Sequence, residues 1–172
     1  MGSQPPTDHV EAADRRDDGS NAFQEHDIPA DIRALSTITD PDYIDLFVLR
    51  TDAASAGTPQ QWARAALDDV AGLAGQFIWR VLLGLRLSSR RSPTHIAGWP
   101  IAGSGENWVV LEAHSWMLTG NLIIRVDDTQ VWLATMIRYD RWLAEPLWNT
   151  LAAKHRSVAP ALLRDARAVV HR

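Results

Sequence analysis

The sequence predicts an α+β domain in which an antiparallel β-sheet wraps against a long C-terminal helix, with a helical pair after the first strand. Three observations predict this class. Apolar and polar residues alternate from residue 95 to residue 139, as is typical of half-buried strands. Apolar residues recur at helical spacing from residue 145 to residue 169. A helix start at residues 58–61 separates the first apolar run from the alternating segment.

The N-terminal part is acidic. Of the 21 Asp+Glu and 17 Lys+Arg, eleven acids and three bases lie in residues 1–45, so this part carries a net charge of −8 and the rest one of +4. Residues 1–26 contain too few apolar side chains to offset the entropy lost on ordering. We therefore expect a disordered acidic tail over residues 1–26 and a single α+β domain over residues 27–172.

The composition excludes several classes of protein. The chain has no cysteine, so it has no disulfide and no thiolate metal site. Its start lacks the basic and apolar regions of a signal peptide, and no run approaches the ~18 apolar residues of a membrane span. The arginines are scattered rather than clustered. We expect a cytoplasmic protein that binds no nucleic acid and has no integral membrane association.

The first strand and the first helix have clear local signals. Residues 43–49 are β-prone and mostly apolar, and they predict a strand. Thr58 can cap a helix, Pro59 suits the first helical position because it needs no N–H there, and Gln61 completes a capping box. The sequence therefore predicts a helix that begins at Thr58.

Two apolar helical faces follow, one from Trp62 and one from Phe77, with glycines between them. They predict two helices or one bent helix before a polar loop at residues 86–93. The second face is flanked by basic residues, namely Arg80, Arg86, Arg90 and Arg91. Such a segment can rest on an anionic membrane surface, form a lid over an apolar cavity, or pack in the core with Arg80 reaching solvent. We favour core packing.

The alternating segment predicts a meander of four strands, over residues 95–101, 107–118, 121–127 and 130–139. Thr119-Gly120 and Asp128-Thr129 suit two-residue hairpin loops. In the resulting register Met117 opposes Leu122 and Val126 opposes Val131. One face of this sheet is then almost wholly apolar and is expected to face the core.

The opposite face mixes charged side chains with three tryptophans, Trp108, Trp116 and Trp132. Either other parts of the same chain cover these rings, or they form a homodimer or partner interface, where tryptophan is enriched. Both interpretations stay open. The last helix opens at Glu145-Pro146, and Pro160 is expected to kink it or divide it.

Catalytic residues are not defined by a motif, and the weak candidates are His114, Arg125 and His155. The predicted register sets His114 opposite Arg125, with Glu112 two positions along, which suits a general base beside an anion clamp. The same residues also suit a solvated sheet face. His155 lies on the apolar side of the last helix, where a core role and a ligand or catalytic role both remain open. Neither a metal site nor a cofactor is predicted, since no ligand spacing is present.

Several short motifs, in order over roughly residues 40–168, resemble the bacterial domain of unknown function DUF2867. They are DYIDLF at 42–47, WARA at 62–65, WRVLLGL at 79–85, His114, TMIRY at 135–139, HR at 155–156 and ALL at 161–163. The order of elements also resembles helix-grip or START-like (SRPBCC-type) domains. That resemblance implies a curved sheet around the last helix with an apolar cavity between them.

The expected cavity lining combines the apolar sheet face with the last helix, namely Leu111, Ser115, Leu133, Thr135, Ile137, Leu151 and His155. The predicted function is binding of a small apolar ligand, such as a lipid, polyketide or aromatic metabolite. Two alternatives remain: an enzyme of cyclase or dehydratase type that uses His114 or His155 with Arg125 or Arg138, and an interaction or oligomeric subunit that docks through the tryptophan-bearing face.

Overall fold

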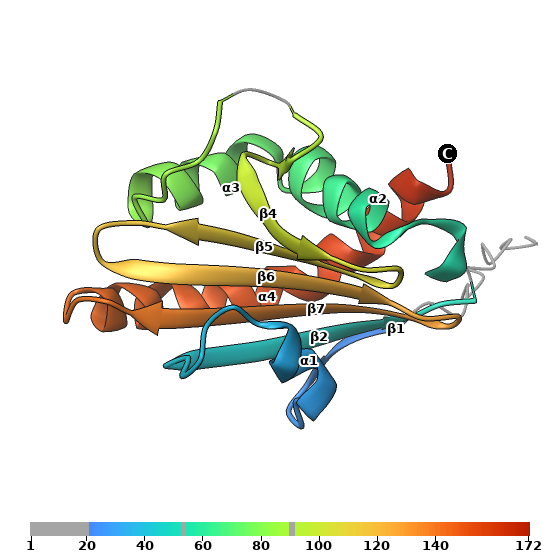
Figure 1. The fold of residues 1–172 in the computed structure, drawn as a ribbon. Helices are drawn as coiled ribbons and strands as arrows, with labels where there is room; N and C mark the ends of the chain where they lie inside the picture. The colour runs from blue at the N-terminus through green and yellow to red at the C-terminus, as the bar shows by residue number, and fades with distance from the viewer. Residues whose placement is uncertain (1–20, 53, 90–91) are drawn as a thin grey trace, which may run out of the picture.

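The computed structural model describes residues 21–52, 54–89 and 92–172, and these residues form an antiparallel sheet with helices on both faces (Figure 1). The sheet has seven strands in the order β1-β2-β7-β6-β5-β4-β3. They are β1 (Asn21–Glu25), β2 (Tyr43–Arg50), β3 (His95–Ile96), β4 (Trp99–Ser104), β5 (Trp108–His114), β6 (Leu118–Val126) and β7 (Gln130–Tyr139).

Short helical segments and one long helix surround the sheet. They are α1 (Ala30–Leu35), η1 (Ala54–Ala56), α2 (Pro59–Arg64), η2 (Ala65–Val70), α3 (Gly72–Phe77), η3 (Ile78–Leu82) and α4 (Ala144–Val170). The run from α2 to η3 and the long helix α4 lie on one face, whereas α1 lies on the other (Figure 1). The predicted α+β class, with a sheet against a long C-terminal helix and short helices after the first predicted strand, is confirmed.

The start of α2 is held by the predicted capping box. The backbone N–H of Gln61 donates to the Thr58 hydroxyl at 3.2 Å, and the Thr58 N–H donates to the Gln61 side chain at 2.8 Å. The helical run then bends through two π-helical segments, η2 and η3, with Gly72 between them at a positive φ of 46°. Of the two predicted alternatives, two helices or one bent helix, the second matches the run from α2 to η3.

The β5–β6 hairpin turns at a different place from the predicted one. Leu122 opposes Leu111 instead of Met117, because the chain reverses at Ser115 and not at Thr119-Gly120. The Ser115 hydroxyl accepts from the N–H groups of Met117 and Leu118 at 3.2 and 3.1 Å, which stabilises a turn there. The partner moves by six residues, an even number, so the side chains that remain in β5 and β6 keep their predicted faces.

The β6–β7 hairpin has the predicted register, since Val126 opposes Val131. Asp127 stabilises this turn, because its Oδ1 accepts from the backbone N–H groups of Thr129 and Gln130 at 3.0 and 2.8 Å. The long helix α4 begins at Ala144 and continues through Pro160 to Val170, so Pro160 does not divide it.

The predicted tail ends earlier than residue 26. Residues Asn21–Glu25 form β1, which pairs with β2 from Asn21 opposite Arg50 to Glu25 opposite Leu46. Backbone pairing with a central strand compensates for the few apolar side chains, and composition alone does not reveal it. Residues 1–20 of the predicted tail lie outside the described residues.

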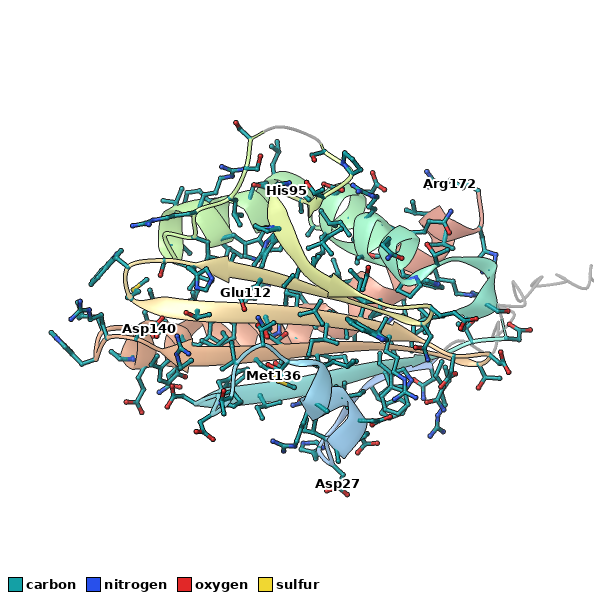
Figure 2. The ribbon with its side chains drawn as sticks, in the orientation of Figure 1. Asp27, His95, Glu112, Met136, Asp140 and Arg172 are labelled. Atoms are coloured by element: carbon teal, nitrogen blue, oxygen red, sulfur yellow. The ribbon has the colours of Figure 1, made fainter. Side chains whose placement is uncertain are left out.

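The tryptophan-bearing face is covered by the same chain. A second buried cluster on this face joins Ile32 of α1 with Leu46, Val48, Val110, Ile123, Ala134 and Met136 of the sheet, and Trp108 and Trp132 pack half-buried against it. Figure 2 shows Met136 and Glu112 on this side of the sheet. Trp116 lies in the β5–β6 turn with 57% of its surface exposed, so the three rings do not share one sheet face.

Candidate functional site

A pocket of about 390 Å³ lies between the sheet and its helical cover, in the size range of small-molecule sites. Strands β6 and β7 form its floor, and α4 with the run from η2 to η3 forms its walls. Most of the lining is apolar, for example Leu122, Leu133, Trp148, Leu151 and Leu162. The pocket therefore occupies the place where the sequence predicts a cavity.

Five predicted lining residues do line this pocket, namely Leu133, Thr135, Ile137, Leu151 and His155. Leu111 and Ser115 do not. Leu111 is fully buried in the main core, and Ser115 belongs to the β5–β6 turn. Ser115 was misplaced because the prediction extended β5 beyond its real end at His114, whereas Leu111 lies within β5, a strand that contributes no residue to the pocket lining.

The segment expected to pack in the core instead covers the pocket. Ala74, Gly75 and Ile78 line the cavity, while Phe77 and Val81 on the outer side are exposed by 56% and 63%. This arrangement corresponds to the lid alternative. Arg80 does not reach for solvent, because its guanidinium donates to Gln76 and to the Leu87 and Ser88 carbonyls. Arg90 and Arg91 lie outside the described residues.

One end of the pocket carries an acid–imidazole pair. Nε2 of His155, on α4, lies 3.2 Å from Oδ2 of Asp45, on β2, and 3.1 Å from the hydroxyl oxygen of Thr135, on β7. Asp45 and Thr135 are cross-strand partners, so the β2–β7 register sets them side by side beneath the helix. The fold thus joins three elements at one imidazole.

Asp45 is the most deeply buried member of this group, with 2% of its surface exposed. The Tyr43 hydroxyl donates to Oδ2 at 2.6 Å, whereas Oδ1 has no hydrogen-bond partner. Burial of the Tyr43 ring, reinforced by its hydrogen bond to Asp45, raises the pKa of Tyr43 far above its ordinary value. Tyr43 therefore stays a hydrogen-bond donor to Asp45 at every physiological pH.

The His155 ring is fixed from several sides. It packs edge-on against Phe47 at 5.8 Å and tilted against Trp148 at 5.5 Å between ring centroids. A carboxylate can only accept, so in the neutral imidazole the contact with Asp45 favours the proton on Nε2, and the lone pair is then on Nδ1. Among the described residues no group donates to Nδ1 or accepts from it.

When the ring proton is on Nε2 of His155, the O–H group of Thr135 remains available to donate a hydrogen bond to a ligand. Nε2–H of His155 is already a donor, so Thr135 cannot donate to it and accepts instead. Besides the polar side chains of Asn121, Lys154 and Asp165, the pocket consequently offers a ligand an acceptor, Nδ1 of His155, and a donor, the Thr135 hydroxyl. This is the small set of polar groups that orients a mostly apolar ligand.

His114 and Arg125 do not form a pair, contrary to the predicted register. His114 opposes Thr119, whereas Arg125 opposes Trp108, six residues away along β5, or roughly 20 Å. Both ring nitrogens of His114 have partners, Glu112 at 2.8 Å and Thr119 at 3.1 Å, and its side chain is 57% exposed. The Arg125 guanidinium bonds to Asp31 of α1.

Arg138, the other predicted cation, is also separated from His155. Its guanidinium bonds to Asp140 at 2.9 Å on the exposed end of β7. Neither His114, Arg125 nor Arg138 lines the pocket. Of the four histidine and arginine candidates for catalysis, only His155 lines the pocket.

Asp45 and Tyr43 were missed by sequence reasoning although a signal was present. Asp45 interrupts an otherwise β-prone run and lies two residues before Phe47. Side chains two apart on a strand point to the same face, so the Asp45 carboxylate points toward the core together with Phe47. Buried acids are rare unless they are paired, so an inward Asp predicts a partner. The partner could not be named, since the β2–β7 register and the placement of α4 are tertiary features.

A second, polar depression of about 270 Å³ lies near η2 and β3 and includes Arg64, Asp68 and Arg80. Its charged groups are already engaged with the protein. Arg64 lies 3.6 Å from Asp68, Asp68 accepts from the Ala97 N–H at 3.0 Å, and Arg80 bonds to the Leu87 and Ser88 carbonyls. This depression is therefore a weaker candidate than the apolar pocket.

The fold and site define an α+β domain whose sheet and C-terminal helix enclose an apolar pocket with an Asp–His pair in its wall. Comparison with family models, curated proteins and solved structures found no match. In the described ranges no helix is both long and apolar enough to span a bilayer. Within those same residues no three His, Asp or Glu side chains are grouped as metal ligands would be.

Proposed function

We propose that the protein binds a small, mostly apolar molecule with one polar group in the pocket between the sheet and α4. The observation that carries this proposal is the lining, in which mostly apolar side chains surround His155 and Thr135. Apolar surface supplies the affinity, and the two polar groups orient the ligand. A lipid, polyketide or aromatic metabolite has this chemistry. The resemblance to DUF2867 and START-like domains stays a prediction.

The helical cover also supports a binding role. Small side chains, Ala71, Ala74 and Gly75, face the pocket from the bent run of η2 and α3. They leave space that larger residues would fill. Both π-helical segments lie in this run, and π-helical turns occur frequently at functional sites. A bent cover with small side chains over an apolar cavity suits ligand entry.

Binding can be tested with the fluorescent apolar probe 1-anilinonaphthalene-8-sulfonate and the full chain. Trp148 lines the pocket, so binding should be saturable and should transfer energy from tryptophan to the probe. Ala161 lines the pocket from α4, and Ala161→Phe should fill part of it and weaken binding at least about tenfold, equivalent to 1.4 kcal/mol.

The matched control is Ala153→Phe, the same substitution at an exposed position of the same helix. It should leave the dissociation constant within about twofold of the parent protein. Absence of saturable binding, or equal weakening by the two substitutions, would overturn the proposal. Circular dichroism of each variant verifies that the helix content is unchanged.

A further inference from the structure

We propose that the pocket is a catalytic site for proton abstraction, in which Nδ1 of His155 is the general base and Asp45 is its positioning residue. The inference rests on the proposed function, because the substrate must first enter the apolar pocket. The substrate class is an apolar carbon acid, a molecule with a C–H bond next to a carbonyl or an equivalent electron acceptor. No oxidant, reductant or metal is required for this step.

The first argument is the arrangement of the imidazole. Nε2 is tied to Asp45 at 3.2 Å and to Thr135 at 3.1 Å, and Phe47 and Trp148 fix the plane of the ring. The remaining nitrogen has no protein partner among the described residues, and His155 lines the pocket. A base whose position is fixed by one nitrogen and whose other nitrogen is free is ready to accept a proton.

The second argument is the carboxylate of Asp45. It is 2% exposed, and its Oδ1 has no partner, so its burial opposes folding. The same carboxylate stabilises the imidazolium that forms when His155 takes a proton, as the acid of an Asp–His pair does in general. A costly buried charge beside an imidazole in a pocket is a recognised mark of a functional site.

The third argument is the hydroxyl of Thr135. Its proton is not used by His155, and Thr135 lines the same pocket. In the proposed step Nδ1 takes the C–H proton, the C–H electron pair forms the C=C bond of an enolate, and the carbonyl electrons move to oxygen. The Thr135 hydroxyl donates to that oxygen. When the substrate also has a C=C bond β,γ to the carbonyl, the enolate is conjugated with that bond. Return of the proton to the γ-carbon then restores the carbonyl and moves the C=C bond next to it, so the isomerisation balances.

The reaction depends on pH through His155 and the charged groups around it. Asp45 and Tyr43 face it from β2, β7 contributes only the neutral Thr135, and Lys154, Arg156 and Asp165 belong to α4. The base is active only as neutral imidazole, so the rate should rise with pH and then level. Without the Asp45 carboxylate the imidazolium is less stable, and the half-maximal rate should occur at lower pH.

The probe for this test is 5-nitrobenzisoxazole, a flat apolar carbon acid. A base removes the proton from C3, the C–H electron pair becomes part of the nitrile, and the N–O bond breaks with its electrons on oxygen. The coloured product is 2-cyano-4-nitrophenolate, and no other reactant is consumed. The parent chain should give saturable turnover above the buffer rate.

His155→Gln should lower kcat/KM by about 100-fold, the usual contribution of a general base, while the naphthalene probe still binds saturably. Asp45→Asn should lower kcat/KM by about tenfold and move the pH of half-maximal rate downward. If Asp45→Asn does not fold, as circular dichroism would reveal, Asp45→Ser replaces it.

Two controls isolate the pocket base. His114→Gln removes another histidine that is paired with a carboxylate, Glu112, but lies on the opposite face. It should leave the rate unchanged. Lys154→Met removes the other basic group of the pocket lining, and it should lower the rate less than His155→Gln does.

The outcomes separate this inference from the proposed function. Probe binding without turnover, or equal turnover by the parent and His155→Gln, would overturn the catalytic inference and leave the binding proposal intact. A larger loss in Lys154→Met than in His155→Gln would overturn the assignment of the base. If Asp45→Asn lowers Tm but changes neither kcat/KM nor the pH of half-maximal rate, Asp45 only ties β2 to α4, and its proposed role is wrong.

Discussion

Nε2 of His155 lies 3.2 Å from the buried Oδ2 of Asp45, so a polar contact inside the core joins the C-terminal helix to the second strand. Apolar residues of α4 such as Trp148 and Leu163 also pack on the sheet, and Arg156 and Arg164 donate to the Tyr43 hydroxyl and the Ala22 carbonyl. The contact between His155 and Asp45 fixes the position of one imidazole in the pocket wall. Its energetic role follows from the cost of burying a carboxylate.

Replacing only His155 should lower the free energy of unfolding more than replacing both His155 and Asp45. His155→Leu leaves the buried Asp45 carboxylate without its imidazole, and we expect it to lower the free energy of unfolding by about 3 kcal/mol. The double variant Asp45→Leu with His155→Leu should recover part of that loss, since no buried charge remains. Urea unfolding at neutral pH measures both. A double variant less stable than His155→Leu would contradict this expectation.

The second prediction concerns Glu112 and acid stability. Burial alone would raise the pKa of Glu112, but hydrogen bonds from Thr37 and Asn121, together with the neighbouring His114, lower it below its ordinary value of 4.5. The folded state therefore gains stability above the unfolded-state pKa and loses it as pH falls through the lower folded-state pKa. Glu112→Gln should flatten the decline of unfolding free energy below pH 4.5.

Chemical denaturation at a series of pH values measures this effect. The control is Glu106→Gln, the same substitution at an exposed position in the β4–β5 turn, and its curve should follow that of the parent. Identical slopes for Glu112→Gln and the parent protein would show that the contacts of Glu112 with Thr37 and Asn121 do not stabilise the folded state.

The third prediction concerns the cover of the outer sheet face. Ile32 of α1 is 1% exposed and packs on Leu46, Val48 and Met136. Ile32→Ala should lower the free energy of unfolding by about 2–4 kcal/mol, because it leaves a cavity. Ile32→Asp should displace α1 and uncover this apolar face, and light scattering should then detect self-association.

Ala34→Asp is the matched control, since it introduces the same charge at an exposed position of α1. We expect it to behave as the parent in both measurements. A stable Ile32→Asp variant with unchanged scattering would mean that α1 is not needed to cover this face.

Local signals were sufficient for much of the fold. The capping box at Thr58 and Gln61 depends on residues three apart, so the chain needs no distant contact to form it. The Val126–Val131 register follows from the Asp127 turn in the same way. Alternation fixed which side chains face the core even where the β5–β6 turn was misplaced, since an even shift preserves the faces.

Features that depend on distant segments were not predictable in this way. Asn21–Glu25 looks like part of a disordered tail until β2 offers its backbone groups, and Ile32 has no visible partner until α1 folds over the sheet. The predicted pair of His114 with Arg125 failed because it depended on the misplaced turn. A register error of this kind moves polar neighbours along the strand without changing their face.

The sequence by itself determined the α+β class and the apolar inward faces of the sheet and the last helix, because each is encoded in the spacing of neighbouring residues. Tertiary structure alone decided that His155 meets Asp45 and Thr135. That meeting depends on the β2–β7 register and on how α4 lies across it, which arise from the packing of the whole core. The pocket wall could therefore be predicted as apolar, but its acid–imidazole pair could not.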